Sequence, residues 1–314
     1  MQLIEPEVNL IGEKNPLIKI EKIGRVCYKS NSEYTEDTAV RFIQSLIKSG
    51  HTSVLEHVNF IFEVSDHTYE YYPFVNYSRT LNMSSPPFSL GDQATTRCLA
   101  STNLRAILEN NYTLFMAAIL KVYPKFKDIF PEGIEERARY QWGSAVLIED
   151  LSVYSNVTAE EVRKHMYYTF QFLTDRGVTH EMVRHRIASF TQESTRFCNY
   201  SNDKFGNEIR CIRPAEWDTW DAGRQSVYEN TLKYAETSYM RLIQMKATPQ
   251  QARGVLPTDL ATTIVMTANV QEWNHFFNLR SRGTTGKPHP NMQYVATKAL
   301  GLFESDLRNK GIIF

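Results

Sequence analysis

The chain has 314 residues, of which 42% are hydrophobic, and this is enough for one large domain or two modest ones with a real core. Lys and Arg together number 35, and Asp and Glu also number 35, so the formal net charge is zero. A neutral chain has no global field to hold nucleic acid or an acidic membrane, and we expect neither partner. Any site for an anion must therefore be local.

The four cysteines lie far apart and form no C-x-x-C pair, which is typical of free thiols in a reducing cytoplasm. For Cys198 and Cys211 we expect structural thiols rather than a metal site, and we predict no bound metal. The first residues, MQLIEPEVNL, carry acids where a signal peptide needs a basic and then an apolar run. No stretch approaches the ~20 apolar residues of a membrane span. These features predict a soluble cytoplasmic protein.

The N-terminal elements are defined by periodicity. Apolar residues at helical spacing predict a helix from about Thr35 to Ser49, with Thr35 as its N-cap and Gly50 just beyond its end. Alternation over residues 58–64 then predicts a strand with one buried face.

From about residue 66 to residue 156 the sequence shows no sustained period. We predict helices around 101–123 and 132–148 within this segment. We interpret the segment as an insertion or lid in a single domain spanning 1–314, because the pieces on both sides of it belong together.

The remaining elements complete the predicted class. A capping box at Thr158–Glu161 predicts a helix that continues to Gly177. The other predicted elements are helices at 179–185, 222–245, 269–280 and 291–306, a short helix after Thr248-Pro249, and a strand at 260–268. The predicted fold class is α+β, an antiparallel sheet with packed helices.

Two familiar motifs fail on their spacing. In HEMVRH, His180 and His185 are five residues apart, about 140° round a helix, so they do not share the face that a zinc-protease helix needs. GTTGK at 283–287 lacks the first Gly and the final Ser or Thr of a phosphate loop, and no G-x-G-x-x-G is present.

The stretch RHRIASFTQESTRF, residues 184–197, concentrates three arginines, one histidine and several hydroxyls. Guanidinium forks suit bidentate phosphate contacts. Nearby acids are few, and the apolar flanks indicate partial burial, which requires a paired anion. A solvent-exposed turn is the alternative.

This stretch resembles the R-H-R-x7-S signature of flavin-dependent thymidylate synthases, with Ser194 in the last position. Three more segments resemble the same family, in the same order: GRVCYKS at 24–30, GHTSVLEH at 50–57, and ARGVLP at 252–257 followed by NVQEWNHFFNLR at 269–280. No motif of the family matches the segment from about 66 to 156.

The resemblance implies a homotetramer that methylates dUMP to dTMP with FAD as its cofactor, and with NADPH and methylenetetrahydrofolate as co-substrates. It implies a mixed fold with active sites at subunit interfaces. Alternatives are methyl or hydroxymethyl transfer to another pyrimidine nucleotide, a nucleic-acid-binding module, and a flavoprotein that only binds nucleotide.

The resemblance also implies site residues. Arg280 would be catalytic, because a guanidinium facing the uracil ring stabilises the negative charge at O4 and N3 that makes C5 nucleophilic. The residues implied to bind dUMP are Glu181, Arg184, Gln192, Glu193, Ser194, Thr195, Arg196, Arg253 and Arg280. The residues implied to bind FAD are Cys27, His51, Ser53, Glu56, Arg184, His185, Arg186, Gln192, Asn269, Gln271 and His275, with Asn269 and His275 coming from a neighbouring subunit.

Four positions depart from the family pattern. Phe197 stands where Tyr is usual, Thr191 where Asn is common, Gln192 where some members have Glu, and Gln271 where many have Arg. These departures leave room for a different substrate.

Several site residues also have structural interpretations. Ser53 and Glu56 could cap a turn, His275 could be a core histidine, and Arg253 could pair with Asp259. We interpret His57 and His165 as structural.

Overall fold

The computed structural model describes residues 1–27, 33–65, 81–83, 98–140, 144–153, 157–202 and 206–312. Within these residues the chain forms two four-stranded antiparallel sheets and one parallel pair of strands. The observed architecture is therefore a mixed helix and sheet fold, as the sequence predicted.

The first sheet has the order β2-β7-β10-β8. Its strands are β2 (Glu7–Leu10), β7 (Tyr167–Asp175), β10 (Ala261–Asn269) and β8 (Ser189–Gln192). The two central strands pair over their full length, from Ala261 opposite Asp175 to Asn269 opposite Tyr167. This long pairing makes β7 and β10 the framework on which the shorter edge strands are placed.

The second sheet has the order β4-β5-β3-β6. Its strands are β4 (Asn82–Met83), β5 (Cys98–Asn103), β3 (Asn59–Ser65) and β6 (Ser144–Ile148). The separate parallel pair joins β1 (Gln2–Ile4) to β9 (Arg210–Ile212).

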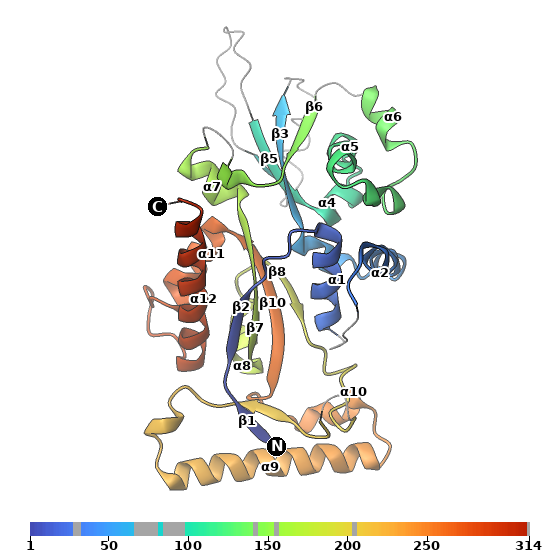
Figure 1. Ribbon diagram of the computed structural model, residues 1–314. Helices are drawn as coiled ribbons and strands as arrows, with labels where there is room; N and C mark the ends of the chain where they lie inside the picture. Colours follow the sequence, from blue (N-terminus) through green and yellow to red (C-terminus); the bar gives the residue numbers. More distant parts are fainter. Residues whose placement is uncertain are drawn as a thin grey trace.

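Helices cover the first sheet on both faces, and Figure 1 looks onto its β2 edge. On one face lie α11 (Val270–Arg280) and α12 (Pro290–Asn309), with the fully buried rings of Trp273, Phe276 and Phe277 between helix and sheet. On the other face lies α1 (Pro16–Val26), beside α2 (Glu36–Lys48).

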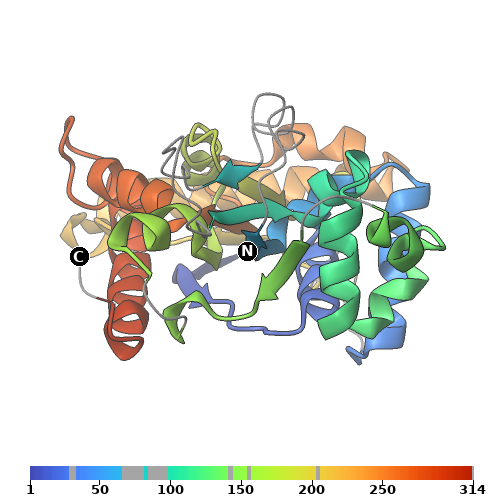
Figure 2. The same cartoon turned by 90° about the horizontal axis from the view of Figure 1, so that it is seen from above.

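The remaining helices pack at the two ends of the molecule. At the end formed by the second sheet are α4 (Leu104–Glu109), α5 (Thr113–Val122), α6 (Ile134–Arg139), α7 (Ala159–His165) and the 3-10 helices η1 (Thr52–His57), η3 (Pro124–Asp128) and η4 (Leu151–Val153). At the opposite end are α9 (Ala222–Gln244), α10 (Pro249–Ala252), η6 (Trp217–Thr219) and η7 (Arg253–Val255), while α8 (Arg176–Met182) follows β7. Seen from above in Figure 2, α12 and α5 lie on opposite sides of the strands.

Most local predictions are confirmed. Helix α2 begins after its N-cap Thr35, and Gly50 has the positive φ of 73° that follows many helix ends. Residues 58, 60, 62 and 64 of the predicted strand are buried, and α9, α10, β10, α11 and α12 all form where they were expected.

One prediction in the C-terminal half is wrong. The helix predicted from Thr158 to Gly177 ends at His165, and residues 167–175 form strand β7 instead. The capping box at Thr158 is present, so the start of the helix was correct. Tyr168, Phe170 and Phe172 alternate with Thr169 and Gln171 as in a strand, but the apolar residues that continue from the helix start also fit a helical spacing.

The helices predicted around 101–123 and 132–148 are only partly present. Residues 98–103 and 144–148 are strands that flank β3, and the helical part breaks at Asn111, whose φ is 52°. Strand β5 is buried along its whole length, so it shows no alternation that would mark it as a strand. The insertion or lid at about 66–156 stays a prediction, and residues 66–80 and 84–97 lie outside the described residues.

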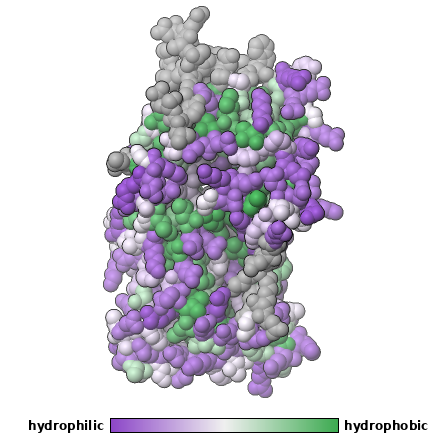
Figure 3. Space-filling model, viewed as in Figure 1, coloured by the Kyte–Doolittle hydropathy of each residue, from purple (hydrophilic) through white to green (hydrophobic). Residues whose placement is uncertain are grey.

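The surface shows where the sheet is less covered. Figure 3 shows apolar side chains gathered along the middle of the face where Figure 1 draws β2 and β7, between more polar outer parts. The edge strand β2 is itself only half-buried or exposed.

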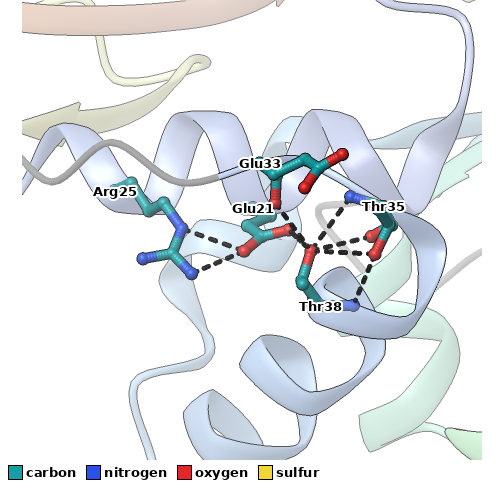
Figure 4. Close-up of polar contacts among 5 residues, drawn as sticks. All are labelled: Glu21, Arg25, Glu33, Thr35 and Thr38. Atoms are coloured by element: carbon teal, nitrogen blue, oxygen red, sulfur yellow. Dashed lines mark hydrogen bonds and ion pairs between the residues drawn. The ribbon is translucent and has the colours of Figure 1, made fainter.

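Helices α1 and α2 are joined by a buried carboxylate. Glu21 is fully buried, and its Oε1 accepts hydrogen bonds from Arg25 Nε at 2.9 Å and Nη2 at 2.6 Å (Figure 4). The hydroxyl of Thr38, in the first turn of α2, donates to the other carboxylate oxygen at 2.7 Å. A buried charge is tolerated only when it is paired and hydrogen-bonded, so this cluster fixes α1 against α2.

We predict that Arg25→Ala lowers the free energy of unfolding by about 3 kcal/mol, because it leaves the Glu21 charge buried without its cation. Urea denaturation at neutral pH measures the loss. The matched control is Lys233→Ala, which removes the exposed ion pair with Glu229 and should change stability little. Equal effects of the two substitutions would contradict a structural role for the Glu21 pair.

Candidate functional site

Helix η1 is locked against the first sheet by His57. The imidazole is fully buried, with Nδ1 2.8 Å from the hydroxyl of Thr267 on β10 and Nε2 3.0 Å from the hydroxyl of Thr191 on β8. Burial, together with the nearby charge of Lys19, lowers the pKa of His57 to about 3. The ring is therefore neutral, with one donor and one acceptor nitrogen, and threonine hydroxyls satisfy both.

The preceding side chain on η1, Glu56, lies between β8 and α4. Its Oε1 accepts a hydrogen bond from Arg105 Nη1 at 2.7 Å, and its Oε2 accepts one from Ser189 Oγ at 3.2 Å. The carboxylate does not cap η1, for which no side-chain cap exists in the structure. The segment GHTSVLEH and the arginine-rich stretch are thus in direct contact, as their shared assignment to one site requires.

A second polar cluster forms where α8 and α11 end. Arg280 Nη1 donates to Glu181 Oε2 at 2.7 Å, and its Nη2 lies 3.4 Å from the main-chain oxygen of the same residue. Arg280 Nε donates to His185 Nε2 at 3.1 Å. The guanidinium is therefore held on three sides before any ligand arrives.

The Arg280 contact also determines the state of His185. Because Nε2 accepts this hydrogen bond, the imidazole must be neutral with its proton on Nδ1. Burial is the main cause, and the charge of Arg280 and His275 adds to it, so that the pKa of His185 falls to about 4. The ring stacks edge-on against His275 and Phe276, at 5.8 and 5.0 Å between ring centroids.

The three arginines of the stretch 184–197 differ from Arg280, which lies outside the stretch. The side chains of Arg184, Arg186 and Arg196 are exposed, and none has an acidic partner among the residues that the structure describes. Arg196 donates from Nε to Gln250 at 3.0 Å, a neutral partner. Arg253 is exposed too, and the described residues contain no ion pair between it and Asp259.

The main chain ties the end of α1 to the signature. The N–H of Ser194 donates to the carbonyl of Cys27 at 3.2 Å. Burial raises the pKa of the Cys27 thiol, which makes it a poor nucleophile at neutral pH. Residues 28–30 of the segment GRVCYKS lie outside the described residues.

Two residues predicted to bind ligand have their side chains turned inward. Gln192 Nε2 donates to the hydroxyls of Thr179 and Thr262, at 3.0 and 3.3 Å. Glu193 is only 2% exposed, and its carboxylate accepts a hydrogen bond from the Tyr200 hydroxyl at 3.2 Å. In this conformation Glu193 is closed off from solvent, while Gln192 is half-buried.

The remaining predicted residues fall into two groups. Thr195 is half-buried, whereas His51, Ser53, Gln271 and His275 are exposed, so His275 is not a core histidine.

Asn269 caps α11 and donates to the carbonyl of Lys164, at the opposite end of this helix from Arg280. Eleven residues of helix separate the two by roughly 16 Å. One chain therefore does not bring Asn269 and Arg280 to one place. That a neighbouring subunit supplies Asn269 stays a prediction.

The sequence interpretation missed Arg105. This residue lies in the segment without a family motif, and its contact with Glu56 joins positions 49 apart in the sequence. No local pattern could have identified it, because only the pairing of β3 with β5 brings α4 beside η1.

The described part of the chain offers neither a metal site nor a membrane-spanning helix. No group of three or more His, Cys, Asp or Glu side chains there could hold a metal ion, and all four cysteines are free thiols. None of the helices in those same residues combines the length and the apolar character that crossing a bilayer requires.

The described residues thus form a mixed helix and sheet protein that exposes the three arginines of the stretch 184–197. The chain belongs to the family described as thymidylate synthase complementing protein (Thy1), whose model matches residues 9–141 and 134–306.

Among curated relatives, the flavin-dependent thymidylate synthase of Geobacter sulfurreducens is 33% identical over 122 residues, 38% of this chain and 50% of its own. That of Pyrococcus furiosus is 33% identical over 125 residues, 38% of this chain and 49% of its own. The chain spans about half the length of the curated relatives that it matches.

A solved structure of the UMP/dUMP methylase PolB from Streptomyces cacaoi, bound with 5-Br dUMP, aligns with 97% of this chain and 93% of its own. The sequence identity is 13% and the TM-score is 0.41, a similarity too low to carry an argument about this chain.

We predict that His57 makes the protein less stable as the pH falls. The pKa of His57 rises from about 3 in the folded chain to about 6.5 on unfolding, so below pH 6.5 the unfolded chain binds a proton that the folded chain does not. Stability present above pH 6.5 is then lost toward pH 3, by up to about 1.4 kcal/mol per pH unit for this one group.

Urea denaturation from pH 4 to pH 7 tests this, with His57→Asn expected to reduce the slope of stability against pH. The control is Thr191→Val, which removes one hydrogen bond but keeps the imidazole, and which should lower stability without reducing the slope. An unchanged slope in His57→Asn would show that other groups cause the acid sensitivity.

Proposed function

We propose that this protein is a flavin-dependent thymidylate synthase that methylates dUMP to dTMP, with FAD as cofactor and NADPH and methylenetetrahydrofolate as co-substrates. We propose further that it is a cytoplasmic homotetramer with a ThyX-like arrangement of active sites between subunits. Membership of the Thy1 family supports the reaction class. The observation that carries the proposal is the placement of Arg280 against His185 of the signature.

The residues present suit phosphate-bearing ligands. Arg184, Arg186 and Arg196 expose guanidinium groups that no acid in the described residues neutralises. Such groups bind phosphate oxygens in bidentate fashion. Arg184 and Arg186 would hold phosphates of the flavin and the nucleotide, while Ser194, Thr195 and Arg196 would hold the dUMP phosphate. FAD, when bound and reduced by NADPH, would supply the hydride.

Arg280 would stabilise the transition state of the nucleotide. Negative charge develops at O4 and N3 of uracil as C5 becomes nucleophilic, and a fixed guanidinium stabilises that charge without reorganising. His185, kept neutral, orients this guanidinium through Nε without competing for the negative charge. Glu181 opposes the effect, since its carboxylate offsets part of the Arg280 charge until the base is seated.

We predict that Arg280→Ala binds FAD but loses turnover of dUMP by about 100-fold or more, as expected when a positioned transition-state donor is removed. Flavin absorbance of the purified protein, titration with dUMP, and chromatography of the nucleotide product give the three measurements. Arg282→Ala is the matched control. Arg282 lies two residues after Arg280 and pairs with Glu304 on the surface, so its removal should leave turnover unchanged.

The outcomes separate the possibilities. Retained turnover in Arg280→Ala would place charge stabilisation on another residue. A hydroxymethylated product, or activity only on another pyrimidine nucleotide, would identify the sister reaction. An unmodified protein that cannot be reconstituted with FAD would contradict the flavin-dependent reaction as a whole.

A further inference from the structure

Arg105 contacts the proposed cofactor site from a segment that carries none of the family motifs. Its guanidinium bridges two carboxylates, with Nη1 2.7 Å from Glu56 Oε1 and Nε 2.7 Å from Glu109 Oε1. The Arg105 and Glu56 side chains are 38% and 28% exposed, so the pair lies at the edge of the protein where a ligand can reach it.

The backbone that carries Arg105 is fixed. Asn103 caps α4 by accepting a hydrogen bond from the N–H of Ala106 at 2.9 Å, and the N–H of Leu104 donates to the carbonyl of Val58 at 3.0 Å. The side chains of Leu104 and Ile107 are fully buried. Helix α4 is therefore anchored next to η1, and Arg105 has little freedom except at its own side chain.

Glu56 is equally constrained from the other side. With Ser189 Oγ on one carboxylate oxygen and Arg105 on the other, both oxygens have a donor. Ionised carboxylates only accept hydrogen bonds, so two fixed donors set the plane of the group. Without Arg105, the carboxylate would keep one weak neutral donor and would present an uncompensated negative charge to an anionic ligand.

We propose that Arg105 is a positioning residue of the flavin site, which orients Glu56 and neutralises its charge so that an anionic cofactor can bind beside it. This inference rests on the proposed function, in which Glu56 contacts FAD. In metal sites, the loss of a residue that orients a ligand side chain costs about 10- to 100-fold in affinity, and we expect the lower end of this range for the flavin. The segment from about 66 to 156, which no family motif matches, would thus supply a residue that positions Glu56 in the flavin site.

A double-mutant cycle tests the inference, with Arg105→Met, Glu56→Gln and the double variant compared for FAD affinity by flavin fluorescence titration. We expect each single substitution to weaken FAD binding by about 10-fold, and the double substitution to weaken it by about the same factor, because Arg105 acts through Glu56. Arg105→Lys keeps the positive charge but not the planar guanidinium with its several donors. It should therefore lose less FAD affinity than Arg105→Met.

Glu109→Gln is the matched control, since it breaks the other ion pair of Arg105 and leaves its contact with Glu56 in place. Because Glu56 keeps both of its donors in this variant, FAD affinity should change by less than about twofold. Thermal unfolding of each variant is measured in parallel.

Three results would overturn the inference. Wild-type FAD affinity in Arg105→Met, with only a lower unfolding temperature, would make Arg105 a structural link between α4 and η1. Additive losses in the cycle would mean that Arg105 contacts the cofactor by itself. A failure of the unmodified protein to bind FAD would remove the proposed function as well, and it would be seen before any substitution is made.

Discussion

The hydrogen bonds of His57 are the interaction on which the site depends, because they join the two sheets through one buried side chain. His57 ends η1, from which β3 of the second sheet continues, and its ring reaches Thr191 and Thr267 on two strands of the first sheet. Thr267 in turn lies 2.8 Å from the hydroxyl of Thr169 on β7. Four segments far apart in the sequence are thereby fixed at one point. They include both GHTSVLEH and strand β8 of the arginine-rich stretch. A charged imidazole could not occupy this place, since burial without a counterion disfavours it.

Around this point the charges are distributed unevenly, although the chain as a whole is neutral. Three glutamates are each paired with an arginine: Glu21 with Arg25, Glu56 with Arg105, and Glu181 with Arg280. The exposed arginines at 184, 186 and 196 have no such partner in the described residues. Each of these three acids is thus neutralised by its own arginine, and the positive charge of the exposed arginines is local. This is how a protein without a net field can still present a surface for phosphates.

The parts of this arrangement that the sequence predicted are those with a local signal. Caps at Thr35, Thr158 and Asn269 marked true helix starts, because a side chain that accepts from the helix N-terminus needs only neighbouring residues. Strand β7 was missed because its apolar residues also fit the helical spacing of the segment that begins at Thr158, which a true capping box had already marked as a helix. The pairs Glu56–Arg105 and Arg280–His185 could not be predicted either, since each joins elements whose proximity is set by sheet register rather than by spacing. Motifs predicted which residues share a site, but they could not predict which of them touch.

The geometry of α11 bears on how a complete site could form. Asn269 begins this helix and Arg280 ends it, and a rigid helix of this length keeps them roughly 16 Å apart in any one chain. The family resemblance assigns the two residues to different ligands, Asn269 to FAD and Arg280 to dUMP. The arginine-rich stretch is flanked by apolar side chains that remain open to solvent, Val183, Ile187 and Phe197, with exposed fractions of 43%, 68% and 57%. Burying such side chains against a second chain is favourable at about 25 cal/mol per Å². Assembly through this surface would gain stability and would bring a second chain next to the arginine-rich stretch, which supports the proposal of sites shared between subunits.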